Sequence, residues 1–199
     1  MGYMKRFEYG RIEKLAQSLD CAGIDKEVGE QILRDAETIL AVTTPEKKAA
    51  WMRGAMQRMD ELLAPDVRQS VREDCACCLG GKREKLVKEI AKKGGSLEER
   101  IKAANETPFV FGHNVALQPD GRILVRFAPE GLEKYGCPCL PKAEQPLPIT
   151  YCYCCGGHVK HHLQIATGRK LEMTVISSAL SSGWKKPCTF LFALACENA

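Results

Sequence analysis

The stretch Val115–Phe127, VALQPDGRILVRF, marks the point where the chain changes from helix-forming to strand-forming sequence. Hydrophobic side chains recur at every second position on both sides of Asp120-Gly121, a dipeptide that favours the tight turn of a β-hairpin. The stretch therefore predicts two antiparallel strands. Hydrophobic residues alternate again over residues 171–175 and 188–194, so we expect a mostly antiparallel sheet.

The residues before the hairpin have the spacing and the end signals of helices. Ile12, Leu15 and Leu19 recur three and four positions apart, which places them on one face of a helix. Ser96 and Glu99 fit a capping box, in which each residue satisfies a backbone N–H at the start of a helix. The sequence therefore predicts an α+β fold, in which helices come first and a mostly antiparallel sheet packed with helices follows.

We expect the chain to consist of two parts. Residues 1–107 form an N-terminal helical part, and residues 108–199 form an α+β part that carries most of the cysteines. The alternative is one continuous unit, joined through a helix that starts at Pro65 and ends at residues 75–78. In the second part we expect a further helix that ends at Gly168, because glycine readily adopts the left-handed C-cap conformation.

The amino-acid composition and net charge indicate which classes of protein this chain can belong to. The chain has 199 residues, of which 45% are hydrophobic and 27% charged, as is usual for globular proteins. No apolar run approaches the roughly 20 residues that span a bilayer, and no signal peptide is evident, so we expect a cytoplasmic protein without a membrane partner. The net charge of +4 is spread among acidic residues and aromatic residues make up only 7%, which disfavours nucleic acid as a partner.

Eleven cysteines are an unusually large number for a chain of this length. Without an export signal, and with an odd count, they indicate metal binding, redox chemistry or buried inert thiols rather than a disulfide framework. Most of them fall in three short motifs: Cys75-Ala76-Cys77-Cys78, Cys137-Pro138-Cys139 and Cys152-Tyr153-Cys154-Cys155.

Close cysteine pairs are typical of zinc sites, because zinc takes four ligands and prefers thiolate and imidazole. Cys75 and Cys78 are three residues apart and would share one face at the end of a helix. An iron–sulfur cluster is less favoured, since the C-x-C pairs do not match the common ferredoxin spacings. We expect a zinc ion whose ligands come from Cys75, Cys78, Cys137, Cys139, Cys152 and Cys154.

Other readings of the cysteines remain open. A low-pKa thiol would suit redox or nucleophilic chemistry, a metal with an open position would suit a hydrolase, and buried thiols would serve only packing. His158 lies four residues after Cys154 and is a further possible ligand, although packing is the favoured interpretation. We expect His161 and His162 to face solvent. The remaining cysteines, Cys21, Cys188 and Cys196, are expected to be structural.

On these motifs the segment Cys75–Leu194 resembles an uncharacterised bacterial family of small cysteine-rich proteins. The last third also resembles, more distantly, aminothiazoline-carboxylate hydrolase-like domains and vinyl-reductase-type small-molecule-binding domains. The resemblance implies a short sheet packed against helices around a pocket for a small, fairly apolar molecule. Cys77 and Cys155 are additions to the family pattern. We therefore expect a zinc-binding small-molecule-binding or sensor protein, with a hydrolase or thiol-based redox enzyme as the alternative.

Overall fold

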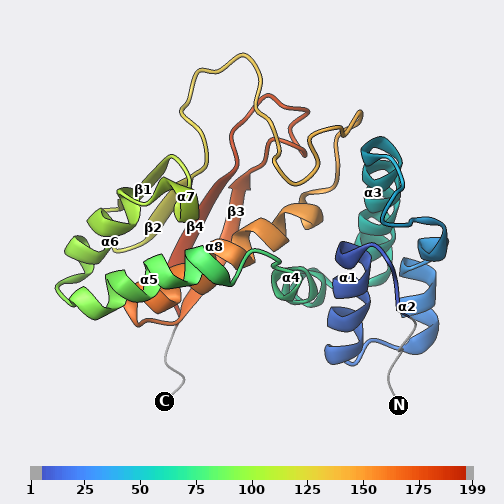
Figure 1. Ribbon diagram of the computed structural model, residues 1–199, viewed down its shortest axis with the longest axis horizontal. Coiled ribbons are helices and arrows are strands. Elements are labelled where there is room, and N and C mark those ends of the chain that lie inside the picture. The colour runs from blue at the N-terminus through green and yellow to red at the C-terminus, as the bar shows by residue number, and fades with distance from the viewer. Residues whose placement is uncertain (1–5, 196–199) are drawn as a thin grey trace.

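Helices occupy the first half of the chain in the computed structural model, which describes residues 6–195 (Figure 1). The capping box of Ser96 and Glu99 is present, because Glu99 N donates to Ser96 Oγ and Ser96 N donates to Glu99 Oε2. The helices are α1 (Gly10–Cys21), α2 (Lys26–Ile32), the 3₁₀ turn η1 (Ala36–Thr38), α3 (Pro45–Leu62), α4 (Pro65–Asp74), α5 (Gly81–Lys93), α6 (Leu97–Asn105) and α7 (Pro108–Phe111).

The predicted hairpin is present and belongs to a four-stranded sheet with the order β1-β2-β4-β3. All three strand pairs are antiparallel, so the α+β fold class and the antiparallel sheet are both confirmed. Gly121 has a φ of 82°, the left-handed conformation that the hairpin turn requires. The strands are β1 (Asn114–Leu117), β2 (Ile123–Arg126), β3 (Leu171–Ser177) and β4 (Thr189–Leu194).

The long helix α8 (Tyr153–Thr167) connects the sheet to the helices (Figure 1). It follows the 3₁₀ turn η2 (Ile149–Cys152), ends before Gly168 as predicted, and packs against α4, α5, α6 and β3. Two adjacent glycines permit this packing. A Cβ on Gly156 would lie 2.6 Å from Met173 Cε on the sheet, and one on Gly157 would lie 2.5 Å from Glu73 O.

The hydrophobic core consists of two clusters. One contains the inner faces of α1, α3 and α4, and reaches Tyr151 and Leu180 from the second half of the chain. The other contains the sheet and α8, and reaches Val87 and Ile101 from α5 and α6. Each cluster therefore draws side chains from both sides of residue 107. No helix in residues 6–195 is long and apolar enough to cross a membrane.

The segment after α4 differs from the prediction. We expected the helix that starts at Pro65 to end at residues 75–78, with Cys75 and Cys78 on one face, but α4 ends at Asp74 and Cys75 is its C-cap. Irregular backbone follows, and Gly80 is the N-cap of α5. The prediction that Cys75 and Cys78 share a helix face is therefore wrong. In this irregular segment Cys75 is buried in the core, whereas Cys77 is exposed.

Candidate functional site

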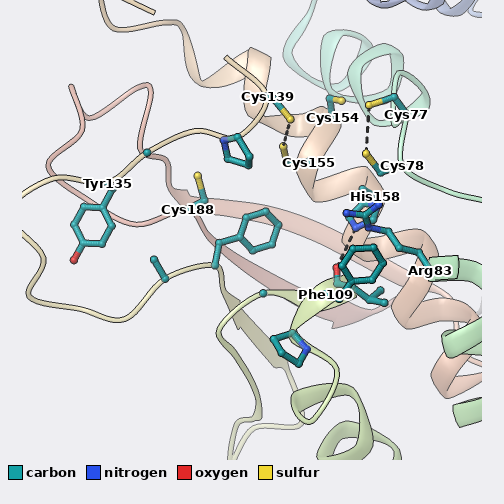
Figure 2. Close-up of a pocket in the computed structure, with 17 residues that line it drawn as sticks. Cys77, Cys78, Arg83, Phe109, Tyr135, Cys139, Cys154, Cys155, His158 and Cys188 are labelled. Carbon is teal, nitrogen blue, oxygen red and sulfur yellow. Dashed lines mark hydrogen bonds between the residues drawn. The ribbon is translucent and has the colours of Figure 1, made fainter. Parts of the chain in front are cut away.

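A cavity of about 300 Å³ lies between the start of α8, helix α7 and the loop that follows β2 (Figure 2). Its walls are mainly apolar, and cysteine side chains gather along one of them. The apolar lining consists of Pro108, Phe109, Val110, Phe127, Ala128, Tyr135 and Pro138, with Cys188 from the start of β4.

Besides Cys188, five cysteines line this cavity, and we call these five the thiol cluster: Cys77, Cys78, Cys139, Cys154 and Cys155. They come from three segments that are distant in sequence: the irregular segment between α4 and α5, the loop after β2 and the first turn of α8. The Sγ atoms of Cys77 and Cys78 are 3.7 Å apart, and those of Cys139 and Cys155 are 3.9 Å apart. All five are free thiols.

The structure divides the six predicted zinc ligands into two groups. Cys78, Cys139 and Cys154 line the cavity, whereas the side chains of Cys75, Cys137 and Cys152 are buried in the first core cluster. The Sγ of Cys75 lies 3.2 Å from Val71 O, and that of Cys152 lies 2.8 Å from Ser178 Oγ.

Cys77 and Cys155 also line the cavity, although the sequence analysis treated them only as additions to a pattern. The signal in the sequence that could have identified them is that each stands directly next to another cysteine. Both adjacent pairs, Cys77-Cys78 and Cys154-Cys155, face the cavity, while the C-x-x-C spacing that suggested Cys75 as a ligand has no such role.

Hydrogen bonding within the cluster separates the thiols into two kinds. The Cys154 thiol lowers the pKa of Cys77 to about 5, and the thiols of Cys137 and Cys155 hold the pKa of Cys139 well below its ordinary range. The same bonds, together with burial, raise the pKa values of the three partner thiols. The cluster therefore favours two thiolates, each stabilised by neutral thiols.

Behind the cluster lies a buried arginine without a carboxylate partner. Arg72 is only 3% exposed, its Nη2 donates to Tyr151 O at 3.2 Å, and its Nε has no hydrogen-bond partner. Burial opposes the charge of Arg72, but the thiols of Cys75 and Cys154 raise its pKa overall. Among residues 6–195 no carboxylate pairs with this guanidinium, so its buried charge is compensated by cysteines rather than by a carboxylate.

A second arginine reaches the same place from α1. Arg11 Nη1 donates to Cys139 O and, at 3.2 Å, to Tyr151 Oη. A small cavity of about 10 Å³ lies between Arg11, Arg72 and three thiols of the cluster, Cys77, Cys139 and Cys154. Nothing in the sequence spacing predicted either arginine, because both lie on amphipathic helices where arginine is usually a solvated surface residue.

The histidines of α8 also differ from expectation. We expected His162 to face solvent, but it is fully buried, with Nε2 3.2 Å from Cys78 O and its ring against Phe111. The prediction fails because the charged face of α8 is covered by α5 and by the segment before it. His158 lines the cavity, its Nε2 lies 3.0 Å from Val110 O, and burial lowers its pKa.

Two pairs of Sγ atoms in the thiol cluster have the separation expected of two thiolates bound to one metal ion. Two thiolates on a tetrahedral zinc ion, each at about 2.3 Å, are about 3.8 Å apart, which is close to the two Sγ separations of the cluster. Within the part of the chain that the structure describes, no set of three or more His, Cys, Asp and Glu residues is arranged as a metal site. Zinc binding therefore stays a prediction.

A family of unknown function, DUF6144, matches residues 12–188 of the chain. The matched region begins in α1, so it includes the helices that the resemblance noted in the sequence did not reach. No curated protein and no solved structure matches the chain. The distant likeness to hydrolase-like and vinyl-reductase-type domains is therefore without support.

Proposed function

We propose that this chain, which belongs to the DUF6144 family of unknown function, binds a small, mainly apolar molecule beside a thiolate-bound zinc ion. The observation that carries the proposal is the meeting of five cysteines from three segments on one wall of an otherwise apolar cavity. The cavity supplies the binding volume, and the thiol cluster supplies the chemically reactive wall.

The cavity supports the binding of a small molecule. Ligand pockets are mostly apolar clefts of about 300–1,000 Å³ with a few converging polar groups. This cavity of about 300 Å³ is at the lower end of that range. Its polar groups are the thiols, His158 and Arg83, while Phe109 and Phe127 contribute aromatic surface. A compact ligand with an apolar body suits these walls.

The charges around the cluster support a metal. A zinc ion with four thiolates carries a net charge of about −2, which is costly to bury without compensation. Arg11 and Arg72 supply two positive charges next to the thiols, and neither forms an ion pair with a carboxylate among residues 6–195. With four thiolate ligands the ion would have no open position, so it would tie the three cysteine-bearing segments together at the cavity wall. The residues that would hold it are Cys77, Cys139, Cys154 and Cys155.

The test is the zinc content of protein purified without a metal-affinity tag. We expect about one zinc per wild-type chain, and a loss of at least half in Cys77→Ser and Cys154→Ser. Cys21→Ser is the matched control, because Cys21 is exposed at the end of α1 and lies outside the cavity. Equal zinc content in all four proteins, or none in the wild type, would reject the metal.

A thiol-based redox activity is the second candidate, and the exposure of Cys77 favours it. This thiol is exposed and adjoins Cys78 and Cys154. In such a reaction Cys77 and Cys154 would close to a disulfide and pass two electrons and two protons to a bound disulfide substrate, which leaves as two thiols. Oxidised glutathione would then produce this disulfide in zinc-free protein, and peptide mass spectrometry would locate it.

A further inference from the structure

The cavity contains a positive charge that forms no ion pair within the described residues 6–195. Arg83 lies in the first turn of α5 and lines the cavity, and Figure 2 shows it beside Phe109 and His158. Its guanidinium carbon is 4.2 Å from the centre of the Phe109 ring. The Nε is buried without a hydrogen-bond partner, and Arg83 forms no ion pair within residues 6–195.

Two acidic side chains, one beside Arg83 on α5 and one on α4, form ion pairs with lysines. Glu84, the next residue along α5, pairs with Lys88 at 2.6 Å, and Glu73 pairs with Lys160 at 2.7 Å. The start of α5 adds to the positive potential, because its N-cap, Gly80, provides no side-chain cap for the first N–H groups. An anion that enters the cavity would thus meet a cation that is not paired with any carboxylate within residues 6–195.

The contact with the Phe109 ring orients the guanidinium of Arg83 so that it suits a planar anion. A guanidinium that lies over an aromatic ring keeps its N–H donors in its own plane, where a carboxylate can accept two of them side by side. Phe109 is 51% exposed, so the pair stands where the cavity meets solvent. A ligand can therefore place its charged end near solvent and its apolar body among Phe127 and Ala128.

The other ionisable groups of the lining favour a single negative charge. His158 is half-buried and uses Nε2 in a contact with Val110 O, so it offers no second cation. Lys82 Nζ lies 5.4 Å from the centre of the Phe109 ring, but Lys82 is exposed and does not line the cavity. A phosphate ester carries more charge than one guanidinium can balance in such apolar surroundings. We propose that the ligand is a small carboxylic acid with an aromatic or branched aliphatic body, and that Arg83 binds its carboxylate; this rests on the proposed ligand-binding function of the cavity.

The experiment is calorimetric titration of the full chain with three acids, benzoate, 3-phenylpropanoate and 4-methylpentanoate, and with their primary amides. An amide has the shape of its acid but no charge. We expect at least one acid to bind wild-type protein about tenfold or more tightly than its amide, as a charge-assisted bidentate contact would give. Arg83→Gln should remove this preference, because it should weaken binding of the acid far more than binding of the amide.

Arg53→Gln is the matched control, because Arg53 lines a separate hollow beside α3 and donates to Pro146 O. It should keep the tenfold preference. Ala128→Phe, which fills the cavity, should weaken acid and amide alike. Equal binding of acid and amide, or an unchanged acid affinity in Arg83→Gln, would overturn the role of Arg83 and leave the pocket in place. Failure of every acid and amide to bind would overturn the pocket as well.

Discussion

Glu73 and Gly157 are in backbone contact, so closely that no side chain fits between them. A Cβ on Gly157 would lie 2.5 Å from Glu73 O and 2.8 Å from Glu73 Cα. This contact is where α4 meets α8, and the ion pair between Glu73 and Lys160 at 2.7 Å joins the same two helices. It also places the segment after α4, with Cys77, beside the first turn of α8, with Cys154.

Replacing Gly157 with alanine should therefore destabilise the fold. Because the obstacle is backbone, the helices must separate, and we expect a loss of about 1–3 kcal/mol in the free energy of unfolding, measured by urea denaturation. Gly156→Ala should cost less, since it meets the flexible side chain of Met173. Gly10→Ala is the control, because nothing lies within 4 Å of its Cβ position. Equal stability of the Gly157 and Gly10 variants would contradict this account.

Removal of Arg72 should weaken zinc binding. We expect Arg72→Met to lower the affinity for zinc about 10- to 100-fold in competition with a chromophoric chelator, because the thiolates lose a buried compensating charge. Arg58→Met is the matched control, since Arg58 also donates to a backbone carbonyl, Ile32 O, but lies away from the thiol cluster. If both variants bind zinc like the wild type, the charge argument fails.

Thiol labelling should separate cysteines that are protected by burial from those protected by metal. Cys75, Cys137 and Cys152 are 3–6% exposed, so we expect them to resist iodoacetamide in the folded protein with or without chelator. Cys77 should react only after chelation, and Cys21 should react at once in both conditions. Peptide mass spectrometry measures the extent of labelling at each cysteine. Rapid labelling of Cys77 before chelator is added would argue against a bound metal.

His162 should make stability depend on pH between about 4 and 6.5. Burial lowers its pKa to about 4, with the positive charges of His158, His161 and Arg83 adding to the effect. The folded state thus favours neutral His162, so its contribution is complete above pH 6.5 and is lost as pH falls toward 4. At pH 5 the loss is about 2 kcal/mol.

The test compares His162→Gln, which has no titrating group at this position, with His113→Gln, whose histidine is exposed on the loop before β1. Urea denaturation at several pH values should show a flatter stability profile for His162→Gln than for the wild type. His113→Gln should follow the wild type. Parallel profiles for all three proteins would show that His162 is already protonated in the folded state or equally titratable in both states.

Much of the fold could be read from local patterns. The hairpin at Asp120-Gly121, the capping box at Ser96 and the glycine end of α8 at Gly168 were all predicted and are present. Each depends on residues within a few positions of one another, so backbone geometry and hydrogen bonding act before any distant segment is in place. The end of α4 was predicted wrongly, since the favourable periodicity runs on to Cys78 while the helix ends at Asp74.

The sequence by itself determined the helices, the antiparallel sheet and the presence of three cysteine motifs. Only the tertiary structure decided which cysteines face a common cavity, because their directions follow from the close contact of Glu73 with Gly157 and from the irregular backbone after α4. The same holds for Arg72, whose position on a charged helix resembles that of a surface residue. It is buried because Tyr151, far away in the sequence, packs over it.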